Sequence, residues 1–301
     1  TIWGGKLTLN TPMLFALGFI GMFVIGGLSG VTHSVVPADT QQTDTYYIVA
    51  HFHYVLFGGA LFGIFSGLYF WFPKVWGRMY NETMGKIHFW LMIIGFNLTF
   101  GPMHWLGLQG QVRRTWVYAE ETNLGFWNLI VTIGAFILAI ATLVFMANWI
   151  YSRRKGEVAP FDPWDARTIE WSIPSPTPVW NFSNAPEVKS LDDFWHQKYG
   201  EDEDGRAVRR EGTDELLLQL EEEGLNPKEE IHLPSPSYFP VIMAFGLPFL
   251  GYAIIYKSIP LALIGVIMLL IGGFGWGTEP LEEEFESSEE EPESGESKNY
   301  E

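Results

Sequence analysis

Residues 44–56 read DTYYIVAHFHYVL and place two histidines, His51 and His53, inside an apolar run that continues to residue 72. A helix needs about 20 predominantly apolar residues to cross the hydrocarbon core of a bilayer, so residues 45–72 are predicted to span a membrane. Ionisable side chains are costly at such a depth, and those that occur there usually serve a function. The two histidines are therefore the first candidates for a functional site.

Five further stretches along the chain have the same length and apolar character: 13–36, 87–108, 125–151, 238–256 and 259–276. The six stretches predict an all-α fold, a polytopic transmembrane helix bundle. We expect four domains, namely four transmembrane helices in 1–151, a cytoplasmic Pro/Trp-rich and acidic linker in 152–237, a two-helix transmembrane hairpin in 238–277 and a disordered acidic tail in 278–301. Within the linker, leucines spaced along 213–223 predict a short amphipathic helix.

Charged residues are segregated from the apolar stretches. The net charge is −17 although 48% of the residues are hydrophobic, and carboxylates gather at 187–230 and 279–301. The basic run RRK at 153–155 predicts a cytoplasmic end for the fourth span, because lysine and arginine favour that side. The same count puts Arg113 and Arg114 on the outer side, against the rule. This exception indicates a specific anionic partner, with a solvated surface pair as the alternative.

The spacing of the histidines indicates two separate centres. The sequence has no cysteine, so thiolate metal sites and iron–sulfur clusters are excluded and any metal must be held by histidine or carboxylate. Positions two apart on an α-helix are separated by about 200°, so His51 and His53 cannot chelate one ion. Two haem irons flanking the helix, with Phe52 pointing sideways between them, fit this geometry, and Arg113 and Arg114 suit paired propionates. The alternative is that each imidazole only hydrogen-bonds a neighbouring helix.

Residues 44–56 closely resemble the signature of cytochrome c oxidase subunit I, a member of the haem-copper oxidase superfamily. Other segments agree with that family in order and spacing: 11–19, 26–31, 86–89, 95–100, 104–108, 113–114 and 170–176. The resemblance covers about residues 1–182 and identifies the chain as a C-terminal fragment of such a subunit. Residues 238–276 resemble the C-terminal extensions of some bacterial and archaeal members, and we interpret them as two anchoring helices.

The resemblance implies roles for particular residues. The first four spans are similar to the last four helices of a twelve-helix core. His51 would be the catalytic residue, as the proximal ligand of the high-spin haem, and His53 would be an axial ligand of the low-spin haem. Arg113 and Arg114 would hold haem propionates. Asp44 would belong to an outer magnesium site.

The sequence departs from the family beside that magnesium site, where Thr43 replaces a histidine that usually binds the ion. A threonine hydroxyl is a weaker ligand for a hard cation. The remaining histidines receive no metal: His33, His196 and His232 are interpreted as ordinary surface residues, and His88 and His104 match family positions near helix ends.

The resemblance also implies an activity, which is reduction of dioxygen to water by electrons from cytochrome c, coupled to proton pumping. The expected cofactors are two a-type haems, copper held by ligands outside this fragment, and magnesium. The expected partners are oxidase subunits II and III, cytochrome c and dioxygen, without nucleic acid, in a prokaryotic plasma membrane. The fragment alone is expected to be inactive.

Three alternatives stay open. A quinol oxidase of the same superfamily carries the same haem motif. A polytopic transporter that relays protons through histidines would need them to face one aqueous path, and it would leave Arg113 and Arg114 unexplained. A non-catalytic membrane anchor would leave the histidines without a purpose.

Overall fold

The computed structural model describes residues 2–5, 7–226 and 236–279. The chain divides into two compact units, residues 1–228 and residues 229–301. Within the described residues, six helices are long and apolar enough to cross a membrane. The predicted all-α, polytopic fold is therefore confirmed. The division into four domains stays a prediction, and the acidic tail predicted for 278–301 lies outside the described residues beyond position 279.

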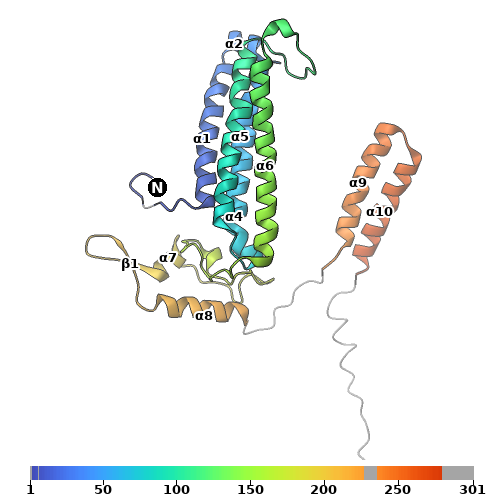
Figure 1. Ribbon diagram of the computed structural model, residues 1–301. Coiled ribbons are helices and arrows are strands. Elements are labelled where there is room, and N and C mark those ends of the chain that lie inside the picture. The colour runs from blue at the N-terminus through green and yellow to red at the C-terminus, as the bar shows by residue number, and fades with distance from the viewer. Residues whose placement is uncertain (1, 6, 227–235, 280–301) are drawn as a thin grey trace, which may run out of the picture. The chain divides into compact units, whose positions relative to one another are not determined.

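Four of these helices run side by side and form the bundle of the first unit (Figure 1). They are α1 (Thr11–His33), the continuous helix made of α3 (Tyr46–Phe52), the π-helix η1 (His53–Leu61) and α4 (Phe62–Trp76), then α5 (Glu82–Leu108) and α6 (Gly125–Lys155). A single 3-10 turn, η2 (Glu120–Thr122), lies in the loop before α6. Helix α5 packs against α6 and α3, whereas α1 packs against η1 and α4.

Side-chain caps set where these helices begin. Asn10 accepts a hydrogen bond from the backbone N–H of Met13 at the start of α1, and Asn81 does the same for Met84 at the start of α5. Thr45 caps α3 in the same manner. Such caps satisfy backbone donors that the first turn of a helix leaves free, and each typically contributes about 1 kcal/mol.

The first span ends earlier than the sequence predicts. The apolar run predicted a helix as far as residue 36, but α1 ends at His33 and a separate short helix, α2 (Val36–Gln42), follows it. Pro37 explains the break, because in a continuous helix its ring would clash with the carbonyl of residue 33. In the first turn of α2 the proline is tolerated, since no intrahelical partner is needed there. Much of the connection between the first two spans is therefore helical.

Aromatic rings fill the space between α1, α4 and α5. The ring of Phe15 is fully buried, and its centroid lies 5.6 Å from the ring centroid of Phe62, 5.9 Å from that of Tyr69 and 5.2 Å from that of Phe89. In a bilayer, helices associate through close packing of this kind, because lipid tails are as apolar as the side chains. Helices α5 and α6 approach even more closely at Gly134, where a Cβ atom would lie 2.6 Å from the backbone nitrogen of Thr99.

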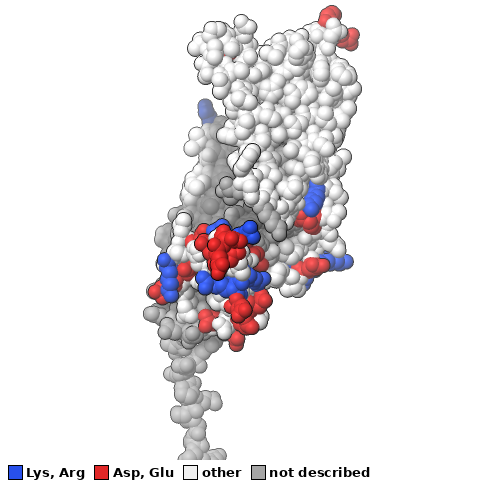
Figure 2. All heavy atoms as spheres, turned by 90° about the vertical axis from the view of Figure 1, so that its left-hand side faces the viewer, with Lys and Arg blue, Asp and Glu red and all other residues white. Residues whose placement is uncertain are grey.

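Residues 156–226 fold against the end of the bundle at which α4 finishes (Figure 1). They contain η3 (Ile169–Trp171), α7 (Asp193–Lys198), the antiparallel strands β1 (Tyr199–Glu201) and β2 (Ala207–Arg209), and α8 (Thr213–Leu225). Helix α8 contains the amphipathic helix predicted at 213–223. On the face shown in Figure 2, most charged side chains gather in this segment, and few lie on the helices above it.

Lys74, near the end of α4, fastens this segment to the bundle. Its residue surface is only 7% exposed. The ammonium donates hydrogen bonds to the backbone carbonyls of Ile173 and Pro174, and it lies 5.1 Å from the ring centroid of Trp171 and 5.7 Å from that of Phe161. Two carbonyl acceptors and two aromatic faces thus replace the water that the buried charge has lost.

A second buried lysine holds the segment together internally. Lys198 is fully buried and donates to the carboxylates of Asp162 at 2.6 Å and Asp165 at 2.9 Å, and to the Ala166 carbonyl at 2.7 Å. The hydroxyl of Tyr199 also donates to Asp165. Burial alone would raise the pKa of Asp165, but the hydrogen bonds from Tyr199 and Lys198 outweigh it and lower that pKa below its ordinary value.

The second unit is a helical hairpin of α9 (Phe239–Tyr256) and α10 (Ile259–Gly277), which match the two predicted C-terminal spans. Lys257 ends α9 with a left-handed backbone, φ 49°, and so turns the chain within two residues. The helices touch closely at Gly272, where a Cβ atom would lie 2.6 Å from the Cβ atom of Met243. Close backbone approach at small residues is typical of helix pairs in membranes.

Candidate functional site

His51 and His53 lie on one continuous helix, at the point where its hydrogen-bonding pattern changes. His51 belongs to α3, and His53 is the first residue of η1. A π-helical segment is rare and often occurs at functional sites. The two imidazoles contact different helices: His51 faces α1, and His53 faces α5. This arrangement agrees with the expectation that they point to opposite sides and cannot share one ion.

The imidazole of His51 is held through one of its two nitrogens. Nδ1 lies 2.9 Å from the Ser29 hydroxyl oxygen and 3.0 Å from the Gly26 carbonyl oxygen, both on α1. A carbonyl oxygen only accepts, so Nδ1 carries the proton in this arrangement. Nε2 makes no hydrogen bond within the described residues and keeps its lone pair. The side chain is therefore in the tautomer that binds a metal through Nε2.

His53 repeats this pattern on the other side of the helix. Its Nδ1 donates to the Val49 carbonyl oxygen at 2.7 Å, and its Nε2 has no hydrogen-bond partner in the described structure. Its ring stacks on that of Phe100 of α5, with centroids 4.0 Å apart and an angle of 13° between the planes. The neighbouring Phe52 ring lies 4.5 Å from the His53 ring. Phe100 was not anticipated from the sequence, although it ends one of the segments that carry the family resemblance.

Small residues on α1 make room for the His51 ring. A Cβ atom on Gly30 would lie 2.9 Å from the Cε1 atom of His51, a distance that real contacts do not allow. A cavity of about 400 Å³ adjoins this place and is lined by α1, Tyr47 and His104. Ser29 and Gly30 were not predicted to contact the site, although a hydroxyl next to a glycine in an apolar helix is a signal that could have indicated them.

His33 corrects one prediction. It was predicted to be an ordinary surface residue, but its side chain is only 12% exposed. Its ring centroid lies 5.0 Å from that of His51 and 5.3 Å from that of Tyr47. The reason is that α1 ends at His33, so the residue belongs to the last turn of a packed helix. His196 is exposed, as predicted, and His232 lies outside the described residues.

The two arginines differ in their surroundings. Arg113 donates two hydrogen bonds to one carboxylate oxygen of Asp44, the first at 2.8 Å from Nε. Arg114 is exposed, has a left-handed backbone with φ 64°, and has no side-chain partner among the described residues. No group of three or more histidine, aspartate or glutamate side chains in the described part of the chain is placed to hold a metal ion.

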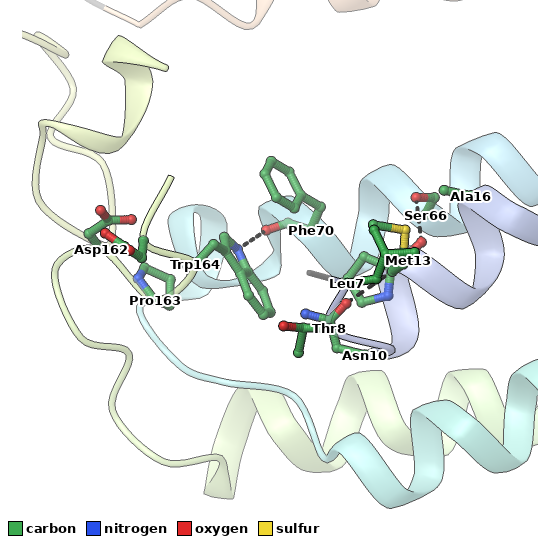
Figure 3. Close-up of a pocket in the computed structure, with 12 residues that line it drawn as sticks. Leu7, Thr8, Asn10, Met13, Ala16, Ser66, Phe70, Asp162, Pro163 and Trp164 are labelled. Atoms are coloured by element: carbon green, nitrogen blue, oxygen red, sulfur yellow. Dashed lines mark hydrogen bonds between the residues drawn. The ribbon is translucent and has the colours of Figure 1, made fainter. Parts of the chain in front are cut away.

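A cavity of about 720 Å³ lies at the opposite end of the bundle, between residues 7–16, α4 and residues 162–165 (Figure 3). Trp164 closes one side by donating to the Phe70 carbonyl at 2.9 Å, and Ser66 donates to the Pro12 carbonyl at 2.8 Å. None of the described residues that line it is a histidine. This cavity is therefore separate from the histidine site.

The chain is similar in sequence to known proteins. Residues 1–137 match the family described as Cytochrome C and Quinol oxidase polypeptide I. Cytochrome c oxidase subunit 1 of Alkalihalophilus pseudofirmus is 42% identical over 91% of this chain and 41% of its own length. The Synechocystis protein of that name is 52% identical over 62% of this chain and 33% of its own length. Quinol oxidase subunit 1 of Bacillus subtilis is 37% identical over 90% of this chain and 39% of its own length.

Residues 1–137 of the chain belong to this family of cytochrome c and quinol oxidase subunit I polypeptides, and the Alkalihalophilus relative extends the similarity over most of the chain. The chain spans 41% of the Alkalihalophilus relative. The similarity also extends further than the predicted limit near residue 182. Coverage of 91% of 301 residues leaves about 27 residues unaligned, so that alignment must continue through α9 and into α10. The similarity to this relative therefore includes most of the hairpin sequence, in agreement with the predicted resemblance of residues 238–276 to C-terminal extensions.

Proposed function

We propose that this chain supplies the haem-ligating helices of the catalytic subunit of a terminal respiratory oxidase. The complete oxidase reduces dioxygen to water with electrons from cytochrome c and couples this reaction to proton pumping. In this oxidase His51 would bind the iron of the high-spin haem at which oxygen is reduced, and His53 would bind the iron of the low-spin haem. One observation carries the proposal: both imidazoles are held through Nδ1, face different helices and keep Nε2 free.

The donor set fits haem in a simple physical sense. An imidazole that donates its Nδ1 proton to a carbonyl is fixed in tautomer and orientation, and its Nε2 becomes a better ligand. Haem bound there would supply a redox-active iron whose properties depend on this ligand. The chain itself holds the two rings against different helices, His51 against α1 and His53 against α5. A proton-relay transporter would instead need both rings to face one path.

The outer residues support this proposal in part. Arg114 has no side-chain partner among the described residues, so its guanidinium is available to a haem propionate, and Arg113 would share its guanidinium between a propionate and Asp44. For an outer magnesium ion, residues 43 and 44 would supply at most two ligands, the Asp44 carboxylate and the Thr43 hydroxyl. Copper, bound by residues of other helices, and subunits II and III complete the proposed membrane enzyme.

Reduced-minus-oxidised spectra of the complete oxidase that contains this chain, purified from its membrane in mild detergent, test the proposal. We expect the bands of two haems in the unaltered protein, loss of one set in His53→Ala, and loss of the other in His51→Ala. The matched control is His196→Ala, which removes an exposed histidine on α7 and should leave both sets unchanged. Absence of haem bands from the unaltered protein, or their persistence in both variants, would overturn the assignment.

A quinol oxidase is the second candidate, because quinol oxidase subunit 1 of Bacillus subtilis is 37% identical to this chain. The histidine site would be the same for either electron donor. Oxygen consumption by the purified complex with reduced cytochrome c, compared with a short-chain quinol, separates the two. Turnover with quinol alone would replace the first candidate by the second and leave the haem assignment intact.

A further inference from the structure

His33 has no part in the proposed ligand set, yet its ring contacts His51. The two ring centroids lie 5.0 Å apart, and the planes meet at 62° in an edge-to-face arrangement. The ring of Tyr47 also contacts His33 edge-to-face, with the two centroids 5.3 Å apart and an angle of 80° between the planes. His33 is thus held between α3 residues one turn apart, Tyr47 and His51.

Hydrogen bonding does not explain why a histidine occupies this place. Both nitrogens of His33 are buried and lack a hydrogen-bond partner in the described structure. The closest acidic oxygen, Oδ1 of Asp39, lies 3.5 Å from Nδ1, which is too long for a good hydrogen bond. What the residue does supply is a flat, rigid ring with a polarised edge, and such rings prefer edge-to-face contact.

The hydrogen bonds of His51 already oppose rotation of its ring, and the contact with His33 adds a restraint on another edge. The bonds from Nδ1 to Ser29 and Gly26 fix one edge of the imidazole, and the bare backbone of Gly30 faces Cε1. Rotation about the Cβ–Cγ bond of a histidine is intrinsically soft, because this torsion has broad minima. A ring that presses on the imidazole restricts that rotation.

We propose that His33 is a positioning residue that sets the plane of the His51 imidazole through ring contact. This inference rests on the proposed function, in which His51 binds the high-spin haem. The orientation of an axial imidazole alters its bonding to iron, so the contact has a consequence beyond packing. An aromatic ring at position 33 should suffice, and the histidine nitrogens should be dispensable.

Two substitutions separate ring contact from volume. His33→Leu introduces an apolar side chain of similar size without a ring, and His33→Phe introduces a ring without nitrogen atoms. Neither leaves a buried polar atom, so both should fold. The readout is the iron–histidine stretching band in the resonance Raman spectrum of the reduced high-spin haem. His196→Ala serves as the control for loss of a histidine elsewhere.

We expect the band to shift and broaden in His33→Leu and to return to its original position and width in His33→Phe, with low-spin haem bands unchanged in both. An unaltered band in His33→Leu with haem fully retained would overturn the positioning role. Equal shifts in both variants would overturn the ring-contact basis. If the unaltered protein contains no high-spin haem, the proposed function fails; if it contains haem but His33→Leu has no effect, only this inference fails.

Discussion

At the scale of single residues, the His51 ring has space because residue 30 is a glycine and has no Cβ atom. We predict that Gly30→Ala will displace the imidazole, because the new methyl group would lie 2.9 Å from Cε1. The high-spin haem should be lost or altered while the low-spin haem at His53 remains. Haem content and difference spectra of the purified variant measure this effect.

The matched control lies three residues away on the same helix. Gly27 has no atom within 4 Å of its ideal Cβ position, so Gly27→Ala should leave both haems in place. It should also stabilise α1 slightly, since alanine is favoured over glycine inside a helix by about 0.5–1 kcal/mol. Identical spectra for the two variants would contradict the proposed role of Gly30.

The sequence predicts some of these residues and not others, for a physical reason. His51 and His53 stand out because ionisable groups are rare in apolar helices. Ser29, Gly30 and His33 act only by contact with His51, and contacts between residues about 20 positions apart depend on how α1 and α3 pack. No periodicity in either segment reports that packing.

At the scale of elements, the π-helix η1 is the feature that the sequence analysis missed. Residues 53–61 are as apolar as an ordinary transmembrane helix, and the apolar pattern does not distinguish α from π hydrogen bonding. The six spans were predictable because their length alone is informative. The end of the first span could also have been predicted from Pro37, but the apolar run continues to residue 36 and suggested a longer helix.

The segment packed at the end of the bundle depends on the buried Lys198. We predict that Lys198→Met will loosen this segment, because the side chain of Asp162, 1% exposed, would be left as an unpaired buried charge. Breaking one partner of a buried ion pair costs about 3–5 kcal/mol. Limited proteolysis should cut residues 161–225 much faster in the variant. Arg206→Met removes an exposed ion pair with Asp204, and the protease should cut this variant at the original rate.

The same cluster predicts a dependence on pH. The pKa of Asp165 is lowered in the folded protein, so its contribution to stability is present above the ordinary carboxyl pKa and is lost as the pH falls through the lowered value. Protease resistance of the segment should therefore decrease below about pH 4. In Asp165→Asn this acid-dependent part should disappear. An equal acid response in both proteins would contradict the role of Asp165.

At the scale of the whole molecule, the basic run at 153–155 predicts the orientation in the membrane. The chain has no cysteine of its own, so a reporter cysteine can be introduced at a chosen position of it. We predict that Trp116→Cys, at a residue 98% exposed in the loop before α6, reacts with a membrane-impermeant maleimide added outside intact cells. Leu191→Cys, at a residue 102% exposed in the opposite segment, should react only after lysis. The reverse pattern would invert the assigned orientation.

The central claim is that His51 and His53 bind two different haems. Spin-state-resolved spectroscopy of the single variants tests it most directly. We predict that His53→Ala abolishes the low-spin electron paramagnetic resonance signal and keeps carbon monoxide binding to the high-spin haem, whereas His51→Ala does the reverse. Loss of both signals together in each variant, in protein that remains folded and inserted in the membrane, would contradict the claim.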